Sequence, residues 1–334
     1  MPLASPPVRI AAAHVFGAHL RQVVHNDGRV RLLSWIVDKI ATKTDWARLD
    51  ALLLPAGFLA LEAPLGPLSS NARHSTLAQS PISFACRTAA MSLARTSDAV
   101  LVLGVDTRPY LRGFSGDQMM VAWRGDTIVG SARKIFPTAA DTAPGKRRPL
   151  LLFEHDADDP ARVVTLSSGR RALLCVCYDA FVFSELVLGP TGKRANLRHL
   201  WTANGAVVEL ASEEQAVFLR RHQRLIAERR PDVALVGIHG FDQPGRETRW
   251  QRHGMAVASA GLKGGLAVGA AHFRWWLPEP DDLGQSTLAS KGVGRQHLKL
   301  GLHRPSRKLR AIDGMFVAVP GSPHLAATIR LFEG

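Results

Sequence analysis

Short apolar runs and stretches of helical periodicity alternate along the first third of the chain. Residues 8–15, 50–54 and 99–105 form apolar runs of strand length, and the last has almost no polar residue, as in a strand covered on both faces. Between these runs, apolar residues at helical spacing predict helices over 29–43 and 83–94. This alternation predicts a mixed α/β protein in which helices cover buried strands.

Hairpins interrupt the alternation further along. The runs 118–123 and 127–132 flank a Gly-Asp turn and predict a hairpin. The remaining predicted strands are 150–153, 162–166, 172–177, 233–238, 266–273, 284–289 and 315–319, and the remaining predicted helices are 213–229 and 253–260. Helices, buried strands and hairpins in this order favour an α-β-β-α sandwich, with two mixed sheets covered by helices, over a simple doubly wound sheet.

No change of composition divides residues 1–334, so we expect a single domain. The weakly patterned connection at about 187–212 is the best candidate for an insertion. The stretch 138–148 is rich in proline, glycine and basic residues, and we expect it to be an exposed loop. A basic C-terminal segment covers about 291–334.

The formal net charge of +14 favours an anionic partner, such as nucleic acid, an acidic surface or an anionic substrate. A solvated basic surface explains the same charge, and the basic run 299–310 lacks the interleaved aromatics of a nucleic-acid-binding motif. The first residues do not read as a signal peptide, and no window has the roughly 18 apolar residues of a membrane span. Three cysteines do not make a disulfide framework. We therefore expect a soluble, cytoplasmic protein with no membrane partner.

Two cysteines stand near the end of the apolar run RALLCVCYDAF, residues 171–181. A nucleophilic cysteine must be held as a thiolate beside a cation or a base, at a place where the thiol can leave the core. The end of a buried strand is such a place, and Cys177 lies there, whereas Cys175 lies two residues deeper. From these residues alone, core packing remains the simpler reading for both, because free cysteine packs as a small hydrophobe.

The residues after the second cysteine carry a resemblance. Cys177-Tyr178-Asp179, followed by Ser184-Glu185, resembles the nucleophile segment of the nitrilase superfamily of carbon–nitrogen hydrolases. The family pattern there is Cys-Tyr-Asp and then Pro-Glu, so serine replaces the proline. The family's hairpin that ends in its catalytic lysine is similar to IVGSARKIFP, residues 128–137. Further similar segments, between residues 8 and 319, are VRIAAAHV, DALLLPAGF, LVLGV, PDVALVGIHGF, RWQRHGMAVASA and GLAVGAAHF.

The resemblance implies roles for several residues. Cys177 would be the nucleophile, and Lys134 would stabilise the thiolate and the tetrahedral oxyanion. The backbone N–H of Tyr178 would be a second oxyanion donor. Asp179 would lie beside the substrate. The pair His239-Gly240, at the end of its strand, would also lie near the substrate. For His239, substrate contact and a loop histidine with a satisfied hydrogen bond are equally good interpretations.

The implied chemistry is hydrolysis of a small amide, N-carbamoyl compound or nitrile through a thioester. Such hydrolysis uses no cofactor or metal, and the sequence has neither a Gly-rich phosphate loop before a helix nor paired Cys/His spacing for zinc. Proteins of this family usually form homodimers, sometimes extended to larger homo-oligomers.

One position departs from the family pattern. The family carries its general-base glutamate in a Pro-Glu-Gly-Phe-like turn, and residues 54–58 read Leu-Pro-Ala-Gly-Phe, so Ala56 stands where the base belongs. Alanine cannot transfer a proton, and loss of a general acid/base costs about 10²–10⁴-fold in rate. Three accounts are open: a natural pseudoenzyme, an engineered Glu→Ala variant, or replacement by another carboxylate. Glu62 and Glu154 are the candidates for replacement. Glu62 lies six residues past Ala56, far along the loop, and Glu154 also reads as a strand-end acid paired with an arginine.

The function therefore stays open among three classes. The first is a C–N hydrolase acting through a Cys177 thioester, impaired by Ala56. The second is an inactive protein of the same fold that binds a partner through its basic surface. The third is an acyltransferase that passes the thioester's acyl group to an amine instead of water.

Overall fold

The computed structural model describes residues 6–16, 26–137, 148–181, 199–241, 245–262, 265–273, 288–292 and 306–334. Its strands are β1 (Arg9–Phe16), β2 (Ala51–Leu53), β3 (Leu59–Leu61), β4 (Val100–Thr107), β5 (Gln118–Arg124), β6 (Thr127–Arg133), β7 (Leu152–Phe153), β8 (Val163–Thr165), β9 (Arg171–Val176), β10 (His199–Trp201), β11 (Val207–Glu209), β12 (Val233–Phe241), β13 (Leu266–Phe273), β14 (Ala289–Gly292), β15 (Ser306–Lys308), β16 (Asp313–Val319) and β17 (Ser322–Glu333).

The α-helices are α1 (Asn26–Ala41), α2 (Ser70–Ala78), α3 (Ser83–Thr96), α6 (Ser212–Arg229), α7 (Arg246–Trp250) and α8 (Ala256–Gly261). A turn of π-helix, Gln251–Met255, joins α7 to α8. Short 3₁₀ turns cover Thr44–Trp46, Glu154–Asp156, Pro160–Arg162 and Cys177–Phe181.

Most strands belong to one large sheet with the order β6-β5-β4-β2-β1-β13-β12-β9-β8. The strands from β4 through β9 along this order run parallel, and β5, β6 and β8 add antiparallel pairs at the two ends. The parallel strands are nearly all apolar, as parallel strands covered on both faces should be. β17 pairs antiparallel with β1 from Arg9↔Glu333 to Phe16↔Ala326.

The large sheet folds back on itself, so that its two halves face each other. A buried core between the halves combines residues of β1, β4, β5 and β6 with residues of β8, β9, β12 and β13. The approach is close: a Cβ added to Gly130 on β6 would lie 2.2 Å from Val164 Cγ1 on β8, and one added to Gly237 on β12 would lie 2.2 Å from Met120 Sδ on β5. The two halves are therefore the two β layers of a sandwich.

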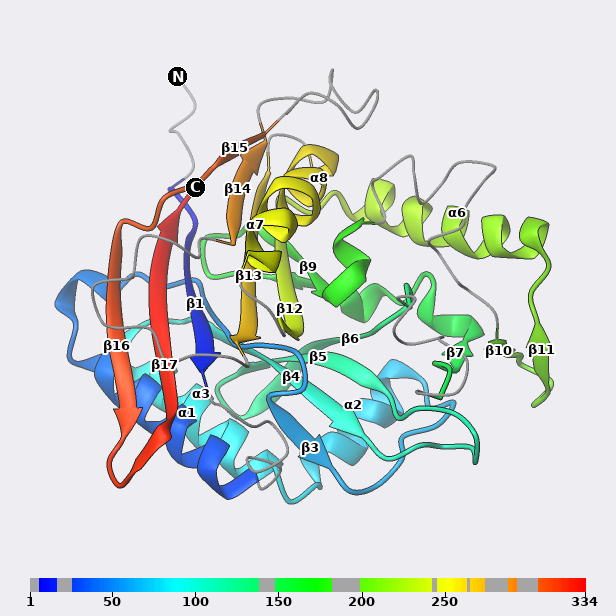
Figure 1. Cartoon of the computed structure of the whole chain (residues 1–334), viewed down its shortest axis with the longest axis horizontal. Helices are drawn as coiled ribbons and strands as arrows, with labels where there is room; N and C mark the ends of the chain where they lie inside the picture. Colours follow the sequence, from blue (N-terminus) through cyan, green and yellow to red (C-terminus); the bar gives the residue numbers. More distant parts are fainter. Residues whose placement is uncertain are drawn as a thin grey trace.

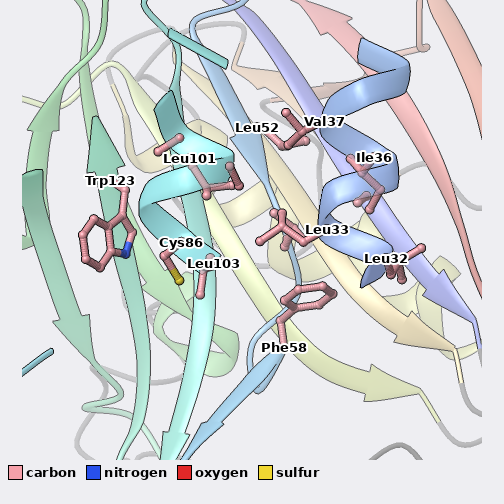
Figure 2. Close-up of a cluster of buried hydrophobic side chains, with 14 of the residues drawn as sticks. Leu32, Leu33, Ile36, Val37, Leu52, Phe58, Cys86, Leu101, Leu103 and Trp123 are labelled. Carbon is pink, nitrogen blue, oxygen red and sulfur yellow. The ribbon is translucent and has the colours of Figure 1, made fainter. Parts of the chain in front are cut away.

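Helices cover both outer faces of this sandwich (Figure 1). α1 and α3 pack on one half and share a second buried core with it. α6 and α8 pack on the other half and share a third. Figure 2 shows how α1 contributes, through apolar side chains at helical spacing that point toward the sheet and α3: Leu32, Leu33, Ile36 and Val37.

The layers run α-β-β-α, which confirms the predicted fold class. The two β layers are not separate sheets, however, because β1 and β13 hydrogen-bond at Val15↔His272 and Phe16↔Phe273 and join them. β7, β10 and β11 form a small second sheet of three strands.

Most predicted elements appear within a few residues of their expected bounds. Among the α-helices and strands, those that were not predicted are α2, α7, β3, β10, β11, β15 and β17. β10, β11 and the first residue of α6 occupy the described part of the candidate insertion at 187–212, whose residues 187–198 lie outside the described residues. Residues 138–147 of the predicted loop, 284–287 of a predicted strand and 293–305 of the basic C-terminal segment also lie outside them.

The single-domain organisation and the insertion remain predictions. Within the described part of the chain, no helix is both long enough and apolar enough to cross a membrane.

Candidate active site

The parallel arrangement brings several polar residues to one edge of the sandwich. β4, β9 and β12 run in the same direction, and β6 shares it because two antiparallel pairings separate it from β4. Their carboxyl ends carry Asp106, Cys177, His239 and Lys134. In α/β sheets this edge is where ligands commonly bind, and these four residues are the candidate site.

Cys177 directly follows β9 and begins a 3₁₀ turn. Its φ is 51°, in the left-handed region that residues other than glycine rarely adopt. Such a conformation costs of the order of 1–3 kcal/mol and is concentrated at functional sites, where the surrounding structure enforces it. The backbone therefore turns sharply just where the sequence predicts the nucleophile.

The two neighbouring cysteines differ in their surroundings. Both belong to the core beneath α6 and α8, as expected for residues two apart on a strand. Cys175 is 1% exposed and Cys177 is 9% exposed. Burial raises the pKa of the Cys175 thiol, so this residue is a core cysteine. Cys86 is also free and buried, and burial raises its pKa to about 12.

His239 pairs with a carboxylate near the nucleophile candidate. Its Nε2 lies 3.1 Å from Asp106 Oδ1. Cys177 lies on the neighbouring chain, because β9 and β12 pair in parallel up to Val176↔Gly237 and Cys177 is the next residue after that pair. Burial lowers the pKa of His239, and so does the charge of Lys134. Asp106 raises the pKa, both by its charge and by its hydrogen bond, and Cys177 raises it further. The net effect raises the pKa of His239 from 6.5 to about 9. His239 is therefore an imidazolium at neutral pH.

The turn after β2 lies directly against this pair. Gly57 has a φ of +63°, and a Cβ there would lie 2.8 Å from Asp106 Oδ2 and 3.2 Å from His239 Cδ2. A side chain at this position would displace the Asp106–His239 pair. Arg29, on α1, holds the turn by donating to the carbonyl oxygens of Gly57 and Phe58, the latter at 2.7 Å.

Ala56 precedes this glycine and is fully buried. A Cβ added to Gly104 on β4 would lie 2.2 Å from the Ala56 Cα, and one added to Gly237 on β12 would lie 3.0 Å from the Ala56 backbone nitrogen. Gly104 also donates its N–H to the carbonyl oxygen of Pro55 at 3.0 Å. The two glycines thus let the turn pack tightly between the β layers. One of them, Gly237, precedes His239 on β12 by two residues, so the turn lies close to His239.

Lys134 follows β6 and is 4% exposed. Its Nζ donates to Gln118 Oε1 at 2.9 Å, and its backbone N–H donates to the Gln118 carbonyl at 2.8 Å. Its charge also acts on His239. Lys134 is thus one of the charged groups around His239, and its role beside Cys177 stays a prediction.

Asp179 fixes the relative position of the two segments that carry the lysine and the cysteine. Its carboxylate accepts N–H groups from Ile135 and Phe136, both at 3.0 Å, and from Val176 at 3.3 Å. Arg162 Nη1 lies 3.5 Å from the same carboxylate. The residues after Lys134 are thereby tied to the end of β9. Asp179 is buried, and its predicted contact with substrate stays a prediction.

A buried network of charged side chains surrounds this tie. Arg162 donates to the carbonyl oxygens of Asp156, at 2.9 Å, and of Arg133. Arg73 pairs with Asp156 at 2.9 Å and with Asp159. Because buried charges are retained at low cost only when paired and hydrogen-bonded, this network fixes the elements beneath the site.

The other predicted site residues lie around this centre. Glu154 accepts the N–H of Ala203 at 3.0 Å and lies 3.8 Å from Arg221. The described contacts of Glu154 are with these two residues, so its catalytic role stays a prediction. Gly240 has a φ of 146° at the irregular end of β12, a conformation that suits glycine.

Tyr178 begins an aromatic cluster beside the cysteine. Its ring centroid lies 5.0 Å from that of Phe181 and 5.5 Å from that of Trp250. Phe241 and Phe273 continue the cluster, with centroids 5.4 Å apart. This apolar wall was not predicted, and neither was Asp106. The sequence could have indicated Asp106, because it is the first charged residue after a fully apolar run. Cys177 was identified by a similar position, at the end of an apolar run.

Comparisons with solved structures give distant similarities. An amidase from Nesterenkonia sp. is 15% identical, covering 99% of this chain and 92% of that one, with a TM-score of 0.48. A double mutant of the Nesterenkonia sp. AN1 amidase in complex with acrylamide is 14% identical, covering 100% and 92%, with a TM-score of 0.47. A CN-hydrolase superfamily protein from Xanthomonas campestris, with an arsenic adduct in its active site, is 13% identical, covering 80% and 76%, with a TM-score of 0.44.

These neighbours are nitrilase-superfamily proteins, but such values are too low to carry a residue's role from them to this chain. A scan against protein-family models finds no match, and a search of curated proteins finds no significant one. Within the described ranges, no group of three or more His, Cys, Asp or Glu side chains is arranged to hold a metal ion.

Proposed function

We propose that this protein hydrolyses a carbon–nitrogen bond of a small amide, N-carbamoyl compound or nitrile through a thioester at Cys177. The observation that supports this most is the position of Cys177, on a backbone turn of φ 51° at the end of a buried strand whose neighbour β12 carries His239. A cysteine that only filled the core would not need this turn, and Cys175 shows how such a core cysteine is placed.

The positive charges beside the sulfur suit nucleophilic attack. A thiolate, rather than a thiol, attacks a carbonyl carbon, and neighbouring cations favour the thiolate. Lys134 and the protonated His239 provide two such cations. When the sulfur bonds to the carbonyl carbon, the carbonyl oxygen becomes an oxyanion, and the Lys134 ammonium stabilises it electrostatically.

Other parts of the prediction rest on the sequence alone. These are the cytoplasmic location, the homodimeric or larger assembly and the anionic partner suggested by the net charge of +14. The backbone N–H of Tyr178 as a second oxyanion donor also belongs here.

Product analysis with a substrate panel tests the proposed function. The unmodified chain is incubated with small amides, N-carbamoyl amino acids and nitriles, and released ammonia and intact-protein mass are recorded. Cys177→Ala is the test variant, and Cys175→Ala is the matched control, because both residues belong to the same buried core. We expect ammonia or a covalent adduct with the unmodified chain and with Cys175→Ala, and neither with Cys177→Ala.

Ammonia release or adduct formation that persists in Cys177→Ala contradicts the proposed nucleophile. Silence of the unmodified chain across the panel supports an inactive binding protein instead. Added amine distinguishes acyl transfer from hydrolysis, because a transferase yields the new amide in place of the free acid.

A further inference from the structure

The proposed reaction needs a group that moves protons, and the expected position holds Ala56. In C–N hydrolysis a proton must reach the departing nitrogen, and another must leave the attacking water. Alanine can do neither. Ala56 is also enclosed by the backbones of β4 and β12, with a 2.2 Å approach at Gly104. The base must therefore come from another element of the site.

We infer that His239, held in place by Asp106, carries out these proton transfers, so that the reacting groups of the site are Cys177, His239 and Lys134. This inference rests on the proposed function, because it assigns the proton carrier for the same thioester chemistry. His239 is the catalytic residue in this inference, since it would exchange protons with the reacting groups beside Cys177, on the neighbouring strand end. Asp106 is a positioning residue that acts through the imidazole.

The geometry supports this assignment in three ways. The Asp106 Oδ1–His239 Nε2 distance is 3.1 Å, within hydrogen-bond range. β9 and β12 pair in parallel up to Val176↔Gly237, so Cys177 and His239 follow that pair on neighbouring strand ends. The turn that carries Ala56 continues into Gly57, whose missing side chain leaves the space that the Asp106–His239 pair occupies. A nucleophile, a base and a group that orients the base is the general arrangement of covalent acyl-transfer sites.

The charged groups around the imidazole come from four elements. Asp106 faces it from the end of β4, Cys177 from the turn after β9, and Lys134 from the end of β6. Arg29, from α1, acts on Asp106 rather than on the imidazole. Burial and Lys134 oppose protonation of His239, whereas Asp106 and Cys177 favour it, and the net effect raises the pKa of His239 to about 9. The resting imidazole is thus ready to give up a proton.

His239 is the only proton carrier in the proposed reaction. The Cys177 thiolate attacks the amide carbon, the S–C bond forms, and the C=O electron pair moves to oxygen. Collapse of this oxyanion expels the nitrogen, which takes the proton of the imidazolium as the C–N bond breaks. The neutral imidazole then accepts a proton from water as the water oxygen attacks the thioester carbon. The second collapse breaks the S–C bond and restores thiolate and imidazolium, with the acid as product.

The competing carboxylates have other partners. Glu62 pairs with Arg108, and both side chains are largely exposed. Glu154 accepts the N–H of Ala203 and lies near Arg221, on the side of the small sheet. No described contact joins either carboxylate to the cysteine, whereas His239 lies on the strand that pairs with β9 up to the residue before Cys177.

The test follows the fate of an acetyl group that is placed on the protein by p-nitrophenyl acetate. Its leaving group departs without a proton, so acetylation requires no proton from His239, and the decay of the acetyl-enzyme isolates the base step. Decay is measured by intact-protein mass after removal of excess reagent, between pH 6 and pH 10. The variants are His239→Gln, His239→Ala, Asp106→Asn and Cys177→Ala. The matched control is His199→Gln, which changes a histidine on β10 of the small sheet.

We expect the acetyl-enzyme of His239→Gln to decay about 10²–10⁴-fold more slowly than that of the unmodified chain, since the general base is lost. Free imidazole should partly restore decay in His239→Ala, which a purely structural role would not allow. Asp106→Asn should shift the pH profile of decay to lower pH, because the imidazole loses the anion that favours its protonation. His199→Gln should behave like the unmodified chain.

Two negative results separate the inference from the proposed function. If the protein acetylates at Cys177 and decay is equally fast in His239→Gln and in the unmodified chain, the role of His239 is refuted while the thioester function stands. If the unmodified chain is not acetylated, or if Cys177→Ala is acetylated equally, the proposed function and this inference fail together.

Discussion

Replacing Asp179 by asparagine tests how the site is held together. The carboxylate accepts three backbone N–H groups, from Ile135, Phe136 and Val176, and lies 3.5 Å from Arg162. An amide has one accepting oxygen and one donating NH₂ group. In the variant, the amide oxygen can accept the N–H groups of Ile135 and Phe136, as Oδ1 of Asp179 does in the unmodified chain. The amide NH₂ group then points at the Val176 N–H and at the Arg162 guanidinium, so donors face donors.

The cost can be estimated from these contacts. Removing one partner of a buried ion pair typically destabilises a protein by about 3–5 kcal/mol, because it leaves a buried charge uncompensated. Leaving a buried N–H without an acceptor costs about 1–3 kcal/mol. Arg162 keeps its two carbonyl acceptors in the variant, which limits its part of the loss. We therefore expect Asp179→Asn to lower the free energy of unfolding by about 3–5 kcal/mol.

Urea denaturation followed by tryptophan fluorescence measures this change, since the chain has seven tryptophans. The matched control is Asp158→Asn, whose carboxylate pairs with Arg221 at 2.7 Å but has a side chain 46% exposed. Exposed pairs contribute roughly 0–1 kcal/mol, so the control should stay within that range. A loss below about 1 kcal/mol for Asp179→Asn would refute the reasoning that a buried carboxylate supports both segments of the site.

Three further predictions follow from packing and burial. Gly104→Ala should cost about 3 kcal/mol in denaturant unfolding, because its Cβ would lie 2.2 Å from backbone of the turn after β2; an unchanged midpoint would contradict this packing. In the folded protein, iodoacetamide should modify Cys177 and leave Cys175 unmodified, as read by peptide mass, since burial raises the pKa of the Cys175 thiol. Burial first, and then Arg162, lower the pKa of His222 to about 3. The unfolded chain therefore binds a proton that the folded chain does not, and stability should fall as pH drops from about 6.5 toward 3, by at most about 5 kcal/mol; His222→Gln should flatten this slope in urea titrations.

The parallel strands of the fold were accessible from the sequence because each is a self-contained pattern. β4 and β13 are apolar along nearly their whole length, and α1 repeats its apolar residues at helical spacing. β17 was missed because it owes its place to partners far along the chain, namely β1 and β16, rather than to an alternation of its own. The join between β1 and β13 depends on two residue pairs, which no local pattern specifies.

In the candidate site too, some features follow from local sequence and others depend on residues far apart along the chain. The position of Cys177 at a strand end distinguishes it from Cys175 in the sequence, and the structure gives the two cysteines different surroundings. The contact of His239 with Asp106 spans 133 residues and depends on two strand ends meeting across the sandwich. The enclosure of Ala56 by glycines of β4 and β12 is likewise a property of the folded layers. Chemistry that depends on residues far apart along the chain becomes visible only when the layers are in place.

The most direct test of the central claim is to locate the acyl group on the protein. The unmodified chain is treated briefly with p-nitrophenyl acetate, quenched in acid and digested, and the peptides that contain Cys177, Cys175 and Lys134 are analysed by tandem mass spectrometry. We predict one acetyl group, on the Cys177 sulfur, that is absent in Cys177→Ala and lost with time at neutral pH. An acetyl group on another residue, or none in the folded protein, would contradict this prediction.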